Sequence, residues 1–234
     1  MATTRHLPDM WWGYYPIVMS RPLLEVAVQS VEAACAAERA GADRLELCVN
    51  LDAGGVTPAV ALLEAVVDRV AIPVFAMVRP RAGDFVYSDD EMNAARRDVD
   101  AAITNGAAGL VLGVLRSDGT MDVERTRDLV QRARGVAVTF HRAFDETPDL
   151  HASLKDALDA GVTRVLTSGG ADSALEGAGP LAALVRASAG RIAIVAGGGV
   201  RAENVVELLA RTGVKEVHAR FEDEIRTRRL VDLL

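Results

Sequence analysis

The stretch "AGADRLEL" (residues 40–47) places a glycine at the end of a helix-patterned segment and then leads, within a few residues, into a short apolar strand. The same pattern returns as "NGAAGLVLG" (105–113), "AGVTRVLT" (160–167) and "TGVKEVHA" (212–219). These stretches hold the second, fourth, sixth and eighth of the expected strands. A fourfold βαβα repeat is typical of a closed eight-stranded barrel, because alternate strands supply alternate layers of its interior.

Short apolar runs alternate with helix-patterned segments after Arg21. Most runs are continuous in hydrophobicity, as strands buried on both faces require. Helix starts are indicated where Thr57 precedes Pro58 and where Ser88 precedes Glu91 in a capping-box pattern. The runs are LLEVAV (23–28), RLELCV (44–49), PVFAMV (73–78), GLVLGV (109–114), AVTFHR (137–142), RVLTSG (164–169), IAIVAGG (192–198) and EVHAR (216–220).

An open, doubly wound sheet is the alternative, since it also alternates strands and helices. No G-x-G-x-x-G motif follows the first strand, however, and the fourfold rhythm favours closure. The sequence therefore predicts one α/β domain, a (β/α)8 TIM-like barrel, over residues 21–234. We expect residues 1–20, which hold both tryptophans, to be an extension outside this fold. The alternative is a hydrophobic arm that docks on the domain or on a partner.

The composition limits the function classes. The chain has 234 residues, a net charge of −7 and no basic stripe, so it lacks the electrostatic footprint of a nucleic-acid-binding protein. No apolar run approaches the roughly 20 residues that a membrane-spanning helix needs, so no membrane association is expected. Its two cysteines do not make a disulfide framework, which favours a reducing, cytoplasmic compartment.

Charged side chains lie in or at the ends of the expected strands. Glu25, Glu46, Arg79 and His141 belong to the first, second, third and fifth strands, and His218 lies on the eighth. In barrels of this kind, the C-terminal strand ends hold the active site, and a buried charge without a partner is costly. We therefore expect the first four to meet at the barrel mouth as catalytic residues. The alternative is a polar plug that orders the mouth without chemistry.

Further charged residues follow the third and fifth strands. Arg81 and Asp84 lie in the loop after the third strand, and Arg142 and Asp145 follow the fifth. So much cationic capacity at two strand ends indicates a small anionic ligand rather than a purely structural role. Within this interpretation, Asp145 orients Arg142.

Two glycine-rich loops are further candidates for ligand binding. Ser168 and Gly169 follow the sixth strand, and Gly198 and Gly199 follow the seventh. Glycines let backbone N–H groups approach a ligand, and loops near the last strands of such barrels often bind phosphate. The alternative is that these loops are simply tight turns.

A metal is the other candidate ligand. Cys48 lies on the same strand face as Glu46, whereas Cys35 belongs to the buried face of the first expected helix. Cu(I) prefers thiolate and thioether donors. Because the cysteines are well separated and no C-x-x-C motif occurs, a copper site would need Cys48 with Met77 or a histidine, or a bridge between subunits.

Six motifs in combination resemble the copper homeostasis protein CutC family, from about Leu24 to Arg220. They are LEVAVQSVEAACAAERAGADRLELCVNLDAGGVTPA (24–59), VFAMVRPRAGDFVYSDDE (74–91), VTFHRAFDE (138–146), RVLTSGGADSALEG (164–177), AGGGVRAENV (196–205) and KEVHAR (215–220).

This resemblance implies a TIM-like barrel, a cytoplasmic location, a homodimer and an association with copper tolerance. It also implies Cu(I) binding through cysteines, with Cys48 at one such position and Cys35 near another, but no established reaction. The chain departs from the family pattern after Arg220, where the charged segment FEDEIRTRRLVDLL (221–234) follows directly. That departure leaves open an incomplete last βα unit.

Three functions follow as hypotheses. The resemblance favours a copper homeostasis protein that binds Cu(I). The residues themselves favour an enzyme that acts on a small anionic or phosphorylated metabolite, with Arg79 and Arg81 holding the anion, Glu46 or Glu25 as base and His141 as acid or electrophile. The third hypothesis is a structural or metal-buffering module.

Overall fold

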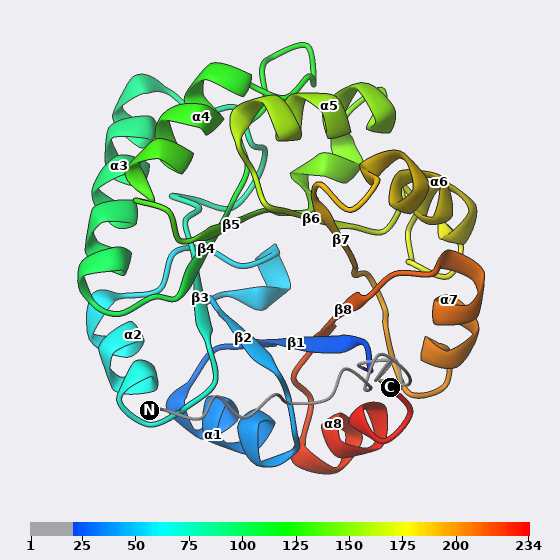
Figure 1. The fold of residues 1–234 in the computed structure, drawn as a ribbon. Helices are drawn as coiled ribbons and strands as arrows, with labels where there is room; N and C mark the ends of the chain where they lie inside the picture. The colour runs from blue at the N-terminus through cyan, green and yellow to red at the C-terminus, as the bar shows by residue number, and fades with distance from the viewer. Residues whose placement is uncertain (1–20) are drawn as a thin grey trace, which may run out of the picture.

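The computed structural model describes residues 21–234, which form a closed barrel of eight parallel strands in chain order with helices around the outside (Figure 1). The predicted (β/α)8 barrel is confirmed. The expectation for residues 1–20 falls outside the described residues. Within the described part of the chain, no helix combines the length and the apolar character that crossing a bilayer requires.

The strands are short and almost entirely buried. Their bounds are β1 Leu23–Val28, β2 Arg44–Leu47, β3 Val74–Met77, β4 Gly109–Leu112, β5 Ala137–Phe140, β6 Arg164–Thr167, β7 Ala193–Ala196 and β8 Glu216–Arg220. The helices are α1 Val31–Arg39, α2 Val60–Val67, α3 Asp89–Thr104, α4 Val123–Arg132, α5 Leu150–Ala160, α6 Ala178–Ser188, α7 Val205–Thr212 and α8 Glu224–Val231. Two 3-10 turns, η1 Leu51–Ala53 and η2 Arg142–Glu146, lie in the loops after β2 and β5.

Side chains alternate between the two faces of each strand, so one set lines the barrel interior and the other packs under the helices. In β2, Leu45 and Leu47 belong to the large apolar core shared with the helices. Arg44 and Glu46, on the other face, are almost fully buried as well. The interior of this barrel is therefore polar on one side, whereas Phe75 and Met77 make it apolar on another.

The helix-start signals are borne out unevenly. Ser88 and Glu91 form the predicted capping box at the start of α3. The start predicted at Thr57 is wrong by two residues, because Ala59 caps α2. The Thr57 hydroxyl instead accepts the N–H of Arg79, which ties the loop before α2 to the end of β3.

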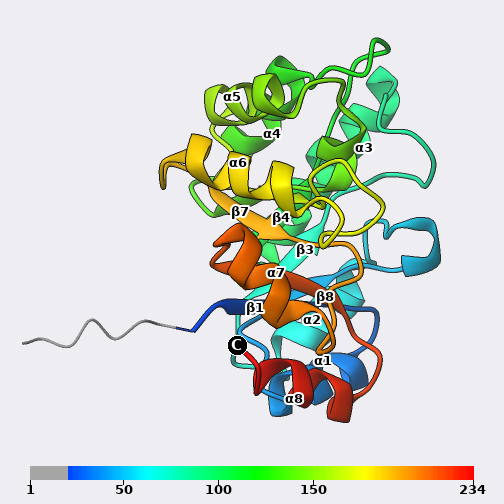
Figure 2. The ribbon, with the colours of Figure 1, turned by 90° about the vertical axis from the view of Figure 1, so that its right-hand side faces the viewer.

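The last βα unit is complete. The charged segment after β8 forms α8, which Asp223 caps by accepting the N–H of Arg226. Figure 2 shows α8 beside α1, and an ion pair between Arg39 and Glu224 joins them at 2.8 Å. The possibility of an incomplete last unit is thus corrected: eight residues suffice for a helix that covers β8 and β1.

Candidate active site

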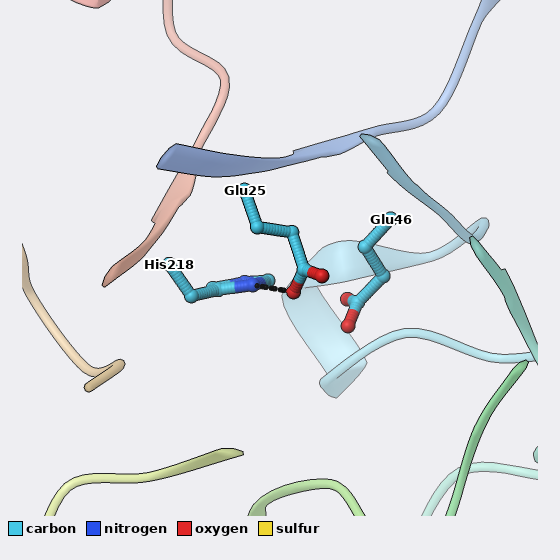
Figure 3. Close-up of side chains that lie close together, drawn as sticks. All are labelled: Glu25, Glu46 and His218. Carbon is cyan, nitrogen blue, oxygen red and sulfur yellow. Dashed lines mark hydrogen bonds and ion pairs between the residues drawn. The ribbon is translucent and has the colours of Figure 1, made fainter. Parts of the chain in front are cut away.

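Two carboxylates and an imidazole project into the barrel from three neighbouring strands. Glu25 from β1, Glu46 from β2 and His218 from β8 each offer an atom within 4.8 Å of the others (Figure 3). The strand register explains the meeting, since Glu25 lies opposite both Arg44 on β2 and His218 on β8. The structure therefore brings together Glu25 and Glu46, as predicted, and adds His218.

Glu25 is held from both sides. Its Oε1 lies 2.7 Å from Nδ1 of His218, and its Oε2 lies 2.5 Å from Nε of Arg44. Arg44 continues the network toward the N-terminal end of the barrel, where it donates to Glu216 at 2.6 Å. Arg164 also donates to Glu216, at 3.1 Å, and both arginines lie over the ring of Phe75. This chain of ion pairs fixes the Glu25 carboxylate in one orientation.

The network separates the protonation behaviour of its members. Burial alone raises the pKa of Glu25, but the hydrogen bond to His218 and the charge of Arg44 outweigh it and lower that pKa to about 2. Burial lowers the pKa of His218, yet the carboxylates of Glu46 and Glu25 raise it above its usual value. Glu25 is therefore a fixed anion, and His218 is biased toward its protonated form.

Glu46 is the member without a fixed partner. Its Oε2 is buried and has no hydrogen-bond partner among the described residues. Burial, together with the charge of Glu25, raises the pKa of Glu46 to about 7, although the charges of His218 and Arg44 oppose the shift. A carboxyl group with this pKa gains and loses a proton near neutral pH, as a general acid or base must.

His141 lies at the end of β5, where it is buried against the ring of Phe85 at 4.8 Å between centroids. Its Nδ1 accepts the N–H of Ala143 at 3.2 Å, so the neutral ring carries its proton on Nε2. Burial and the charge of Arg79 lower the pKa of His141 to about 3. The buried Nε2–H has no acceptor among residues 21–234, which leaves a neutral donor available.

Gly113 and Thr139 complete the surroundings of this imidazole. A Cβ on Gly113 would lie 2.4 Å from the ring of His141, so only glycine allows the close approach. Thr139, two residues before His141 on β5, has a buried hydroxyl that finds no partner in the described chain. The Thr139 hydroxyl is therefore a second neutral polar group without a hydrogen-bond partner, in addition to the Nε2–H of His141.

Arg79 connects two loops. Its guanidinium donates to the carbonyl oxygens of Ala53 and Gly55 at 2.9 Å each and to that of Gly83, and it lies 4.7 Å from the centre of the Phe85 ring. Both terminal nitrogens therefore have carbonyl partners, and the position next to His141 makes Arg79 an electrostatic neighbour of the imidazole. An anion would find only its Nε without a hydrogen-bond partner.

Arg81 and Asp84 bind each other at 2.9 Å, and Arg81 also binds Glu91 at 2.5 Å. Because Glu91 lies in the first turn of α3, these pairs tie the loop after β3 to the start of that helix. Their predicted part in ligand binding remains a prediction.

Asp145 accepts several hydrogen bonds from the loop after β6. It accepts from Ser168 and from the N–H of Gly170 at 3.0 Å, and Arg142 donates to it at 2.9 Å. The N–H of Gly169 is used by Thr167. The backbone donors expected to face a ligand here thus serve an internal carboxylate, while the predicted pairing of Asp145 with Arg142 is present.

The glycines after β7 differ from those after β6 in how their backbone N–H groups are used. Gly198 and Gly199 have positive φ angles of 105° and 70°, and their N–H groups donate no hydrogen bond within the described part of the protein. A Cβ on Gly198 would lie 3.6 Å from the guanidinium carbon of Arg142 and 3.2 Å from Ser168. The loops after β6 and β7 therefore do meet, as the strand order requires.

The two cysteines lie on opposite sides of the barrel wall. Cys48 points inward and packs with Phe75 and Met77, whereas Cys35 lies on the outer helix α1. The Cys48 Sγ and the Met77 Cε lie 3.2 and 3.3 Å from the place that a Cβ on Gly55 would occupy, so the two sulfur-bearing side chains share one corner. Burial and the charge of Glu46 raise the pKa of the Cys48 thiol well above its usual value.

Sequence reasoning places His218 on a strand without giving it a role and passes over Arg44. The sequence signal that could have identified both residues is a second charged residue two positions away on the same strand. Arg44 and Glu46 share one face of β2, and Glu216 and His218 share one face of β8. Charged residues that repeat at this spacing within buried strands must face each other inside the barrel.

The molecule is thus a (β/α)8 barrel with buried charged residues in its interior. The model of the CutC family matches residues 22–223, and the chain belongs to this family. A relative from Xylella fastidiosa named family protein CutC is 46% identical over 207 residues, which are 88% of this chain and 78% of the relative. The human protein named copper homeostasis protein cutC homolog is 47% identical over 196 residues, 84% of this chain and 72% of its own length.

Solved structures agree. A crystal structure of a protein named CutC from Streptococcus agalactiae superposes with a TM-score of 0.80 at 34% identity, and the match covers 84% of this chain and 97% of that one. An aldolase named QR15 superposes with a TM-score of 0.69 at 12% identity, covering 92% of this chain and 97% of that one. The second likeness shows the shared barrel fold and nothing about the reaction.

Proposed function

We propose that this protein is an enzyme that moves a proton on a small carbonyl-containing metabolite held in the mouth of the barrel. The observation that carries the proposal is Glu46, a buried carboxyl group with a pKa of about 7 and an Oε2 without a hydrogen-bond partner among residues 21–234. A structural ion pair does not leave an oxygen unpaired in this way, because an unsatisfied buried acceptor is costly.

In this proposal, the ionised Glu46 takes a proton from the carbon next to the substrate carbonyl, and the electron pair of that bond moves to the carbonyl oxygen. His141 donates its Nε2–H to that oxygen, and the Thr139 hydroxyl assists. A neutral imidazole suits the role because its Nε2–H stabilises the developing negative charge through a hydrogen bond, without a proton transfer that would leave an imidazolate. β2 and β5 are not neighbours in the barrel, so the substrate lies between Glu46 and His141.

The charges of Glu25 and His218 together set the pKa of the Glu46 carboxyl group. The fixed anion at Glu25 raises the pKa of the Glu46 carboxyl, and the protonated His218 counters it. Return of the proton from Glu46 to the same carbon reforms the carbonyl group and completes the exchange. No outside oxidant or co-reactant is required for this step.

Hydrogen–deuterium exchange tests the proposal. The protein is incubated in D2O with small ketones and aldehydes, and NMR follows the loss of the C–H signal next to each carbonyl. Wild-type protein is expected to catalyse exchange on at least one compound, and Glu46→Gln to lower the rate by about 10²- to 10⁴-fold. Exchange that survives Glu46→Gln unchanged contradicts the proposal. Cys48→Ser is the matched control in the same interior, and it should keep the activity.

The names of the relatives favour a second function, Cu(I) binding. Cys48 and Met77 supply the thiol and thioether that Cu(I) prefers, and their shared corner at Gly55 is the observation in its favour. Cys35 on the outer helix does not join them. The raised pKa of Cys48 opposes binding, because the thiol must lose its proton to become a strong ligand.

Copper titration separates the two functions. Under a competing Cu(I) chelator, a site at these sulfurs predicts one bound ion per chain that Cys48→Ser removes and Glu46→Gln retains. Retention of the ion by Cys48→Ser excludes this site. Within either proposal, we also propose a cytoplasmic location and a homodimer, which the family resemblance supports and which cell fractionation and analytical ultracentrifugation of the full chain test.

A further inference from the structure

A cavity of about 470 Å³ lies beside the mouth, where the loop after β7, the end of β8 and helix α8 come together. Its lining includes Arg201 and Glu203 from the loop, Arg220 from β8, and Arg226 from α8. The volume falls within the range of small-molecule sites in proteins, roughly 300–1,000 Å³. The cavity is therefore large enough to take part of a small metabolite.

The lining is basic although the chain as a whole is acidic. Arginines at positions 201, 220, 226 and 229 outnumber glutamates at positions 203 and 222 among the lining residues, although Asp52 and Asp223 next to the lining also pair with two of these arginines. A cluster of guanidinium groups recognises phosphate through paired N–H donors. Such a concentration of arginine beside a catalytic mouth indicates an anionic ligand.

The ion pairs of these arginines are open to exchange. Arg220 binds Asp52 at 2.6 Å, with about half of the arginine side chain and 90% of the aspartate side chain exposed. Arg229 binds Glu203 at 2.8 Å, and Arg226 binds Glu222 and, at 3.5 Å, Asp223; the side chains of these pairs are partly exposed. Exposed pairs of this kind contribute little to stability, so an incoming anion replaces them at small cost. The Arg201 guanidinium makes no ion pair within residues 21–234.

The cavity is connected to the proposed catalytic groups through β8. Arg220 follows His218 by two residues and lies on the same face of the strand, so its side chain crosses the mouth toward η1. Its charge also acts on Cys48, the inward-facing residue two positions after Glu46. Arg220 is therefore the lining residue that shares a strand face with His218. In barrels of this fold, a phosphate commonly binds at the loops of the last two βα units.

We propose that this cavity binds the phosphate group of the substrate, so that the enzyme acts on small phosphorylated carbonyl compounds. The inference rests on the proposed function for the identity of the substrate, but the anion site itself is testable without it. Arg201 and Arg226 bind the phosphate oxygens from the two walls, and Arg220 joins them from the mouth. The carbonyl end of the same molecule then reaches Glu46.

Inorganic phosphate is the probe. The melting temperature of the full chain is measured as phosphate replaces chloride at constant ionic strength, and malonate serves as the carboxylate comparison. The wild type is expected to gain a rise in melting temperature that grows with the logarithm of the phosphate concentration, as ligand binding to the folded state requires. The double variant Arg201→Ala/Arg226→Ala should lose that rise, and malonate should produce a smaller one.

Two variants make the result decisive. Arg186→Ala removes an exposed arginine at the far end of α6 and should keep the phosphate effect. Glu46→Gln should also keep it while losing proton exchange, which separates a failed anion site from a failed catalytic proposal. A phosphate effect that persists in the double variant, an absent effect in the wild type, or an equal effect of malonate overturns the assignment.

Discussion

Nδ1 of His218 lies 2.7 Å from Oε1 of Glu25 in the interior of the barrel. The opposite faces of the two strands, β8 and β1, are apolar and pack under the helices. Arg44 holds the other oxygen of the same carboxylate. Glu25 therefore has no freedom to rotate and no free oxygen, whereas Glu46 beside it retains one. The two chemically similar carboxylates thus differ in hydrogen bonding, and the proposed base is the one with an unpaired oxygen.

Replacing Arg44 with methionine tests the fixed half of the site. The change leaves Glu25 buried without its cationic partner and also removes a donor from Glu216. Breaking one side of a buried ion pair costs about 3–5 kcal/mol. We expect a loss of that size in the free energy of unfolding, measured by urea denaturation at pH 7.

Arg186→Met is the control for this prediction, because Arg186 is exposed on α6 and forms no ion pair within the described residues. Its loss should lie within about 0.5 kcal/mol, as for other surface substitutions. An Arg44→Met protein as stable as this control would mean that Glu25 is not buried as an anion.

Glu46→Gln tests the unpaired half through pH. The pKa of Glu46 rises from 4.5 to about 7 on folding, so the folded state retains a proton that the unfolded state releases. The contribution of Glu46 is thus fully present below pH 4.5 and is lost as the pH rises through 7. Between pH 4.5 and pH 8, the wild type should lose about 3 kcal/mol relative to Glu46→Gln.

Chemical denaturation of both proteins across this range measures the difference. Titrations of other groups cancel to the extent that the substitution leaves them unchanged. Parallel pH profiles for the two proteins would show that Glu46 ionises normally and would remove the main support for its role as a base.

The fold and the interior carboxylates could be predicted from the sequence because strand periodicity dictates them. Alternation along β1 and β2 requires Glu25 and Glu46 to face inward once the barrel closes, and the fourfold repeat indicates closure. The partners of the cations could not be predicted in the same way. Arg79 binds backbone carbonyl groups whose positions depend on two loop conformations, and no spacing rule in the sequence encodes them.

Asp145 illustrates the same limit from the acidic side. The glycine-rich loop after β6 predicts an external anion, but Asp145 from η2 already accepts hydrogen bonds from the N–H groups of that loop. The competition between an internal carboxylate and a ligand for the same N–H groups is decided by the length and the turn of η2. Patterns of single residues do not contain that information.

Asp145→Asn makes this internal contact measurable. The substitution removes the charge that Ser168, Gly170 and Arg142 share, and it places an NH2 group where one of those donors now points. Because hydrogen bonds to a charged group contribute more than neutral ones, we expect a loss of about 3 kcal/mol in the free energy of unfolding. Asp172→Asn, an exposed change in the loop after β6 that Asp145 contacts, is the matched control and should have little effect. Equal stability of the two variants would contradict an anchoring role for Asp145.

His141 offers a test of the neutral donor on which the proposed chemistry depends. The pKa of His141 falls from 6.5 to about 3 on folding, so between these pH values the unfolded chain binds a proton that the folded protein does not bind. The stabilising contribution is present above pH 6.5 and declines as the pH falls toward 3. From pH 6.5 to pH 4, the wild type should therefore lose about 3 kcal/mol relative to His141→Gln, whereas His151→Gln, an exposed change, should follow the wild type.

Nitrogen-15 NMR of the imidazole checks the same point directly. Because Nδ1 accepts the N–H of Ala143, the proton should remain on Nε2 and the ring should stay neutral down to about pH 4. A ring that becomes doubly protonated near pH 6.5 would carry a positive charge beside Arg79 under ordinary conditions. It would then act as a cation rather than as the neutral donor, and the proposed part of His141 in catalysis would have to be abandoned.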